Sequence, residues 1–168
     1  LDGLGRARDQ QSASLALAAL ADEAAEMRRV AVRVVGVLKP TEAVAALAQA
    51  VDDADPETAK TAALTLADMK SPESLARLND LAGGAQRRAR VWVAVALHRA
   101  GAAGTAERFN SLLGDADETI RRQAVSVLPQ LAGLDPLDLF IRAIEDKDRE
   151  VRKIARDQLS KSDVPRAR

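Results

Sequence analysis

Residues 146–159 read Asp-Lys-Asp-Arg-Glu-Val-Arg-Lys-Ile-Ala-Arg-Asp-Gln-Leu, and related patterns occur upstream at intervals of 31 residues. The stretch 115–128 reads Asp-Ala-Asp-Glu-Thr-Ile-Arg-Arg-Gln-Ala-Val-Ser-Val-Leu and keeps the acidic pair, the β-branched residue, and the Arg, Ala and Leu. Self-similarity on a short fixed period is the signature of a repeat protein, in which each unit buries its apolar face only against its neighbours. The 31-residue period therefore decides the fold class.

The apolar positions of the repeat predict two helices in each copy. In the first half, helix A, two apolar rows lie four residues apart, which is the spacing of one helix face. These rows are Ala16, Leu47, Leu78, Phe109 and Phe140, then Leu20, Val51, Ala82, Leu113 and Ile144. In the second half, helix B, the inward rows are Met27, Thr58, Ala89, Ile120 and Val151, then Ala31, Ala62, Val93, Ala124 and Ala155, then Val35, Leu66, Leu97, Leu128 and Leu159. The sequence thus predicts an all-α fold.

The period also sets the predicted domain organisation. The repeats are expected at 10–40, 41–71, 72–102, 103–133 and 134–164, followed by a tail at 165–168. Leu4 lies 31 residues before Val35, so residues 1–9 are expected to be the end of a truncated preceding repeat. An unsealed end of such an array predicts end-to-end self-association.

Several residues predict where helices begin and end. Asp55, Asp117 and Asp148 precede helix B and are suited to accept hydrogen bonds from its first amides. Pro129 falls inside the fourth helix B, where it removes a backbone hydrogen bond and is expected to end the helix near Leu128. The pair 83–84, Gly-Gly, predicts a looser connection in the third repeat.

Composition excludes several classes of function. The chain has no cysteine, so it has no disulfide and no thiolate ligand or nucleophile. It has 25 basic and 25 acidic residues, which gives no long-range field for nucleic acid. No apolar run approaches the ~20 residues of a membrane helix. We therefore expect a cytoplasmic protein with no membrane segment, no metal, no cofactor and no catalytic residue.

The Asp-x-Asp motif followed by Val-Arg-x-x-Ala-x-x-x-Leu resembles HEAT repeats, in particular the short HEAT-like repeats also found in phycobilisome lyases. The resemblance covers residues 10–164 and is weaker where Ala59 replaces the Arg and Gln86 the Asp. It implies an α-solenoid of about five two-helix repeats, a right-handed superhelix with A helices outside and B helices lining a concave surface. It further implies a protein-binding role and does not imply lyase activity.

Charged residues recur as strictly as the apolar rows. The basic row is Arg28, Arg90, Arg121 and Arg152, and the acidic row is Asp22, Asp53, Asp115 and Asp146. These rows could form a charged recognition stripe or a ladder of salt bridges between repeats, with Arg forks reaching carboxylates or connection carbonyls. The periodicity favours the ladder, because stacking follows a repeat whereas function tends to break it.

Interruptions of the pattern give the candidate binding site. Leu64, Val91 and Val95 are apolar at helix B positions that are mostly polar in other repeats, and His98 follows them. Basic residues are expected to surround this apolar centre, namely Arg29, Arg33, Lys60 and Arg122. Such a surface suits an acidic, partly hydrophobic peptide or protein. The alternative is an apolar surface without a partner, and Trp92 at its edge is read as a packing residue more readily than as a binding anchor.

Three functions follow in order of preference. The first is a non-enzymatic protein-protein interaction scaffold that binds a protein or peptide on the concave helix B face. The alternative is an accessory or lyase-like subunit that holds a substrate or chromophore protein for a partner enzyme. A nucleic-acid-binding repeat protein is the least favoured, because the net charge is zero.

Overall fold

A computed structural model describes residues 2–84 and 89–161. Within these ranges the chain forms ten α-helices and one 3-10 helix, with no strand. None of these helices combines the length and the apolarity that crossing a bilayer requires. The helices belong to two compact units, Leu1–Gly101 and Ala102–Arg168, called unit 1 and unit 2 below. The predicted all-α solenoid of paired helices is confirmed.

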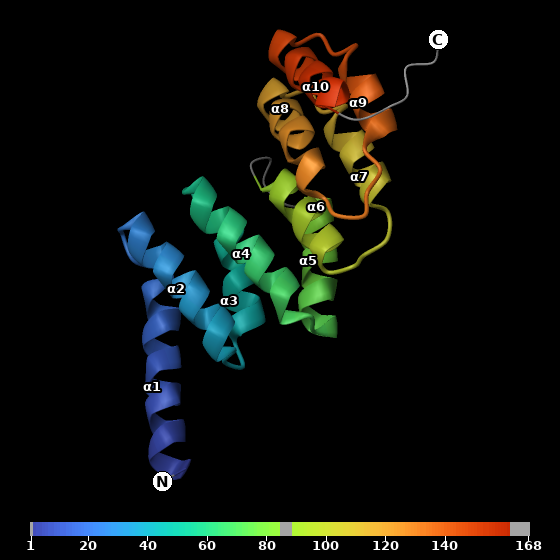
Figure 1. The fold of residues 1–168 in the computed structure, drawn as a ribbon. Coiled ribbons are helices and arrows are strands. Elements are labelled where there is room, and N and C mark those ends of the chain that lie inside the picture. The colour runs from blue at the N-terminus through green and yellow to red at the C-terminus, as the bar shows by residue number, and fades with distance from the viewer. Residues whose placement is uncertain (1, 85–88, 162–168) are drawn as a thin grey trace. The chain divides into compact units, whose positions relative to one another are not determined.

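Unit 1 contains three helix pairs. Its helices are α1 (Asp2–Ala19), α2 (Ala25–Leu38), α3 (Ala43–Ala50), α4 (Pro56–Met69), α5 (Pro72–Gly84) and α6 (Arg90–Arg99). The B helices stack in order, α2 on α4 and α4 on α6, and the A helix α3 packs on α5 (Figure 1). Within unit 1, α2 and α4 are therefore each covered by the next B helix along the chain.

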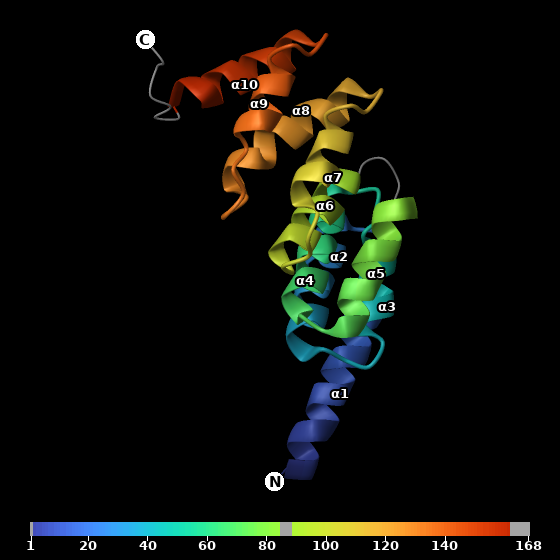
Figure 2. The same cartoon turned by 90° about the vertical axis from the view of Figure 1, so that its right-hand side faces the viewer.

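Unit 2 contains two helix pairs. Its elements are α7 (Thr105–Leu112), α8 (Glu118–Val127), the 3-10 helix η1 (Leu128–Gln130), α9 (Leu137–Ala143) and α10 (Arg149–Lys161). The B helix α8 stacks on α10, and α7 contacts α9 (Figure 2). The α-helix gives way to η1 at the residue before Pro129, which confirms the predicted helix end.

The predicted apolar rows form the core. The first helix A row is buried in all five repeats, and so is the second inward row of helix B. Two positions differ from the prediction. Ala82 is exposed, and Met27 is 48% exposed although the four residues equivalent to it are at most 3% exposed.

The first helix runs across the predicted boundary between residues 1–9 and the first repeat. Residues 2–19 form the single helix α1, with no break in the backbone between 2–9 and 10–19. The stretch contains no Pro, and the first turn comes only at residues 20 and 21. At the third connection, α5 continues through Gly84, and the expected looseness falls on 85–88, outside the described residues.

Each predicted N-cap makes its hydrogen bond. The carboxylate of Asp55 accepts from the Thr58 amide at 2.8 Å, and that of Asp117 accepts from the Thr119 amide at 2.8 Å. Asp148 accepts from the amides of the second and third residues after it. These bonds satisfy amides at helix starts that have no intrahelical partner.

A bidentate arginine joins the first repeat to the second. Arg28 on α2 donates from Nε to Oδ2 of Asp53 at 2.7 Å and from Nη2 to Oδ1 at 2.8 Å. Its Nη1 donates to the carbonyls of Asp22 and Glu23 in the connection of its own repeat, at 2.8 and 2.9 Å. The hydrogen bonds from Arg28 hold the pKa of the Asp53 carboxyl below its usual value. We call this arrangement the inter-repeat clamp.

The same clamp joins the fourth repeat to the fifth. Arg121 on α8 donates to both carboxylate oxygens of Asp146, at 2.8 and 3.1 Å, and to the carbonyls of Asp115 and Ala116. These bonds use four of the five guanidinium N–H groups of a side chain that is 3% exposed. The ladder interpretation is thus confirmed for Arg28 and Arg121.

Both halves of the clamp are missing together at one junction. In both clamps the aspartate follows the arginine by 25 residues. The second repeat has Ala59 at the arginine position, and the third repeat has Gly84 at the matching aspartate position. Removing only one half would leave a buried charge without its partner, which is costly. There α4 and α6 are joined by apolar packing and by an exposed bidentate pair between Asp68 and Arg99. Arg90 and Asp115 belong to different units, and their pairing stays a prediction.

The stack of α2 on α4 requires a glycine. A Cβ added to Gly36 would lie 2.3 Å from Cγ2 of Thr65, well inside van der Waals contact. The Thr65 side chain is fixed, because its Oγ1 donates to the carbonyl of Thr61 at 2.7 Å. The next atoms, Cβ and Oγ1 of Thr65, lie at ordinary contact distances of 3.6 and 3.8 Å.

Gly36→Ala should therefore destabilise the wild-type protein by about 1–3 kcal/mol through overpacking. In a Thr65→Ser background the clashing methyl is gone while the hydroxyl bond to Thr61 can persist. There the same change should stabilise by up to about 1 kcal/mol, because Ala is the better helix former. Urea unfolding of the four proteins tests this reversal of sign, and an equal effect in both backgrounds would contradict the close approach.

Burial should decide what each bidentate arginine contributes to stability. Arg121→Ala leaves the Asp146 carboxylate buried without its cationic partner and should lower the free energy of unfolding by about 3–5 kcal/mol. Arg99→Ala removes a bidentate pair whose side chains are about half exposed and should cost below ~1 kcal/mol. Chemical denaturation of both variants makes the comparison. Similar losses of unfolding free energy in the two variants would show that burial of the clamp does not increase its contribution to stability.

The clamp should also make stability depend on pH. Burial favours the neutral form of Asp146, but hydrogen bonds from Arg121 and the Asp148 amide outweigh it and keep the pKa of Asp146 below its usual value. The stability from this carboxylate is therefore present above the unfolded-state pKa of about 3.9 and lost as pH falls toward the lower folded-state pKa. The destabilisation caused by Asp146→Asn should be largest at neutral pH and shrink below about pH 4.

Unfolding free energies measured by urea titration across this pH range provide the check. Asp157→Asn is the control, because the exposed Asp157 makes no ion pair with a described residue. If Asp146→Asn destabilises the protein equally at every pH, the charge of Asp146 does not contribute to the free energy of unfolding, and the prediction is contradicted.

Candidate functional site

The candidate binding surface lies on the stacked B helices of unit 1. Seven of the eight predicted residues belong to these helices: Arg29 and Arg33 to α2, Lys60 and Leu64 to α4, and Val91, Val95 and His98 to α6. The eighth, Arg122, lies on α8 of unit 2 and is described with that unit. Residues 31 apart occupy the same turn of neighbouring B helices, and α4 carries Lys60 and Leu64 between the other two helices.

The prediction that Val91 belongs to the exposed apolar centre is wrong. Its side chain is 0% exposed, in the first turn of α6. The helix α6 buries Val91, Val93, Ala94, Ala96 and Leu97, so it is apolar around most of its circumference. A helix that is apolar on most sides is buried on most sides, whereas a surface helix buries only one apolar stripe. Leu64 and Val95 are half-buried and form the remaining apolar centre.

Trp92 lies beside this centre and contacts one of its basic residues. The Nζ of Lys60 lies 4.7 Å from the centroid of the Trp92 ring, a cation-π distance, and 3.4 Å from Oε2 of Glu57. Trp92 is half-buried, so part of the indole stays accessible. The sequence favours a packing role for Trp92, although its place one residue after the row of Lys60 indicates that it borders this surface.

Two of the predicted basic residues make ion pairs between repeats. Arg122 donates from Nε and Nη2 to the two oxygens of Asp148, at 2.8 and 2.6 Å. Hydrogen bonds from Arg122 and the Val151 amide hold the pKa of Asp148 far below its ordinary range. Arg29 has the equivalent acid, Asp55, 3.5 Å from its Nε, and this buried Nε makes no hydrogen bond to a described residue.

Asp55 and Asp148 neutralise these two arginines, and in unit 1 the Arg29–Asp55 pair reduces the free positive charge beside the apolar centre. Both acids are the N-caps of the following helix B, so Arg29 and Arg122 also connect successive repeats. The pairing was missed from the sequence, although the 26-residue spacing from Arg29 to Asp55 and from Arg122 to Asp148 repeats. Arg33 is exposed and makes no ion pair with a described residue, which leaves it the most available cation on α2.

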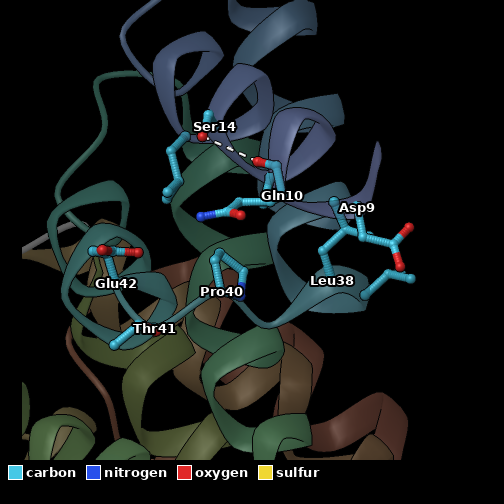
Figure 3. Close-up of a pocket in the computed structure, with 10 residues that line it drawn as sticks. Asp9, Gln10, Ser14, Leu38, Pro40, Thr41 and Glu42 are labelled. Atoms are coloured by element: carbon cyan, nitrogen blue, oxygen red, sulfur yellow. Dashed lines mark hydrogen bonds between the residues drawn. The ribbon is translucent and has the colours of Figure 1, made fainter. Parts of the chain in front are cut away.

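Unit 1 also has an open pocket of about 600 Å³ that the sequence did not predict. It lies between α1 and the α2–α3 connection, and Figure 3 shows Asp9 and Gln10 on one side and Pro40 and Glu42 on the other. Val37 also lines it and is 79% exposed, at a repeat position that is polar in the four repeats after it.

Neither in this pocket nor elsewhere in residues 2–84 and 89–161 could a group of three or more His, Cys, Asp or Glu side chains hold a metal ion.

Comparisons with known proteins agree with this geometry. The chain is similar to the complex of CpcE and CpcF of phycocyanin lyase from Nostoc sp. PCC7120, with a TM-score of 0.51 and 20% sequence identity. The alignment covers 86% of this chain and 62% of that chain, so the protein spans under two thirds of the length of this neighbour. At this identity the likeness shows the fold alone.

A search of curated proteins gave no match. The family model described as HEAT repeats matches residues 4–98, which is more than half of the sequence and includes nearly all of unit 1. The chain belongs to the HEAT repeat family.

Proposed function

We propose that this protein is a non-enzymatic interaction scaffold that binds a protein or peptide on the B-helix surface of α2, α4 and α6. The observation that carries the proposal is the pair Leu64 and Val95, half-buried apolar side chains at equivalent positions of neighbouring B helices. Polar or charged residues occupy this position in the other three repeats. Membership of the HEAT repeat family supports a scaffold role.

The chemistry around this pair suggests the kind of segment that would bind. Arg33 is an exposed cation on α2, and Lys60 lies over the face of Trp92 on the neighbouring helices. An apolar side chain of a ligand would cover Leu64 and Val95, and a carboxylate would pair with Arg33 or compete with Glu57 for Lys60. The fitting ligand is therefore an acidic segment with one or two apolar anchors.

A second candidate is an accessory subunit that holds a substrate or chromophore protein for a partner enzyme. It draws on the similarity to CpcE and CpcF of phycocyanin lyase, which is itself a complex of two protein subunits. Purification with a coloured or small-molecule ligand would favour it. Nucleic-acid binding is the least supported, and retention on heparin that falls steeply with salt would favour it. The cytoplasmic location stays a prediction.

The proposal predicts that Leu64→Glu with Val95→Glu abolishes capture of a specific partner. Two carboxylates at the apolar centre would repel an acidic ligand and remove its contact area. A matched control is Ala45→Glu with Ala76→Glu, which adds the same charge at exposed helix A positions of the same unit. Cross-linking in extracts of the native host, followed by mass spectrometry, compares these proteins with the wild type after circular dichroism has shown equal helicity.

The expected result is a partner captured by the wild type and the control and lost from the Leu64→Glu, Val95→Glu protein. Binding of that partner as a purified protein should weaken at least ~10-fold in the same variant. The same set of captured proteins in all three samples would contradict binding at this surface.

A further inference from the structure

The first and the last of the described repeats carry complementary halves of the inter-repeat clamp. We propose that copies of this protein associate head to tail, with Arg152 of one copy holding Asp22 of the next and with Met27 covered by the contact. The contact uses Asp22 just before α2 and Met27 at its start, whereas Leu64 and Val95 belong to α4 and α6, so the two proposals can be tested with different variants.

The first observation is the orientation of Arg152. Its Nη1 donates to the carbonyls of Asp146 and Lys147, at 2.7 and 2.8 Å, as the Nη1 atoms of Arg28 and Arg121 do in their own connections. In Arg28 and Arg121 the other edge, Nε and Nη2, holds the aspartate of the following repeat. Among the described residues, no carboxylate pairs with this edge of Arg152. Its fork is therefore oriented for a carboxylate.

The second observation is the state of Asp22. Its Oδ1 accepts the amide of Ala24 at 2.8 Å, the same turn that prepares Asp53 and Asp146 for their arginines. Within the described part of the chain no arginine donates to the Asp22 carboxylate. Arg28 bonds the backbone carbonyl of Asp22 and the carboxylate of Asp53. Asp22 is thus the acceptor half of a clamp, shaped by its turn and lacking the donor.

The third observation is the exposure of Met27. At this position of helix B, Thr58, Ala89, Ile120 and Val151 are at most 3% exposed, whereas Met27 is 48% exposed. The helix B of the preceding repeat packs against α4, α6 and α10, and so covers this position there. Among the described residues, no preceding helix B packs against α2. Val30 on the next turn is also 44% exposed. A helix B stacked on α2 would bury this surface.

Charge complementarity selects a second copy as the occupant. The first repeat offers Glu23 and Glu26, both exposed, beside Asp22. The helix α10 offers the exposed Arg156 beside Arg152, at the position where Val32, Ala63, Ala94 and Val125 are buried in the other repeats. An acidic neighbour would pair with Arg156, and the first repeat supplies Glu23 and Glu26 beside the apolar Met27. A contact of this kind between different surfaces propagates into larger species instead of closing as a dimer.

Sedimentation velocity over a range of protein concentrations tests the proposal, using the full chain. The wild type should form species larger than a dimer as concentration rises, and salt should weaken them. Asp22→Arg and Arg152→Asp should each weaken association at least ~10-fold, because each places like charges across the contact. An equal mixture of the two variants should associate again, since the introduced arginine of one variant then faces the introduced aspartate of the other.

A second pair of variants keeps the test decisive if either charge reversal disturbs folding. Met27→Ser should weaken association, whereas Ala76→Ser, which changes an exposed apolar side chain on α5 in the third repeat, should leave it unchanged. A wild type that stays monomeric at the highest concentration would overturn the proposal and leave another HEAT-like repeat as the occupant. Equal effects of Met27→Ser and Ala76→Ser, or a mixture of charge variants that stays monomeric, would also overturn it.

Discussion

The guanidinium of Arg121 connects three segments at once, and the register of the repeats depends on this kind of contact. One edge donates hydrogen bonds to the carbonyls of the connection before its own helix, and the other edge donates to the carboxylate of the next connection. A planar fork tolerates little displacement, so the two connections are set in distance and in angle. Apolar stacking supplies most of the free energy of such an array, but it is not directional and cannot fix the register alone.

Much of this architecture could be predicted from the sequence, because stacking repeats the same physical demand every 31 residues. Leu47, Leu78 and Phe109 were assigned to the core by period alone, and all three are buried. The arginine and aspartate rows were also sufficient to predict salt bridges for Arg28 and Arg121. These predictions hold because each residue meets the same neighbours in successive repeats.

The errors occurred where a residue's surroundings differ from those of its equivalents. Val91 was placed at the surface because its row is basic in other repeats, yet α6 is apolar on most sides and encloses it. Met27 was placed in the core because its row is buried, yet α2 has no described B helix stacked before it. Arg29 and Arg122 are predicted from the sequence to face a binding partner, but each pairs with an acid of the next repeat. The sequence pattern does not show which acid lies opposite each arginine across the junction between repeats. The candidate site was therefore predicted less completely than the fold, and two of its residues also serve the stack.

The junction between α4 and α6 gives the array an uneven response to acid. Stability in repeat proteins is close to a sum of terms for each repeat and each interface. Protonation of Asp53 and Asp146 weakens the interfaces of α2 with α4 and of α8 with α10, but the interface of α4 with α6 has Ala59 in place of the clamp arginine. Its apolar packing does not titrate. As pH falls, the α2–α4 interface therefore weakens more than the α4–α6 interface, whose exposed Asp68–Arg99 pair contributes little, and the α4–α6 pair becomes the most persistent folded part of unit 1.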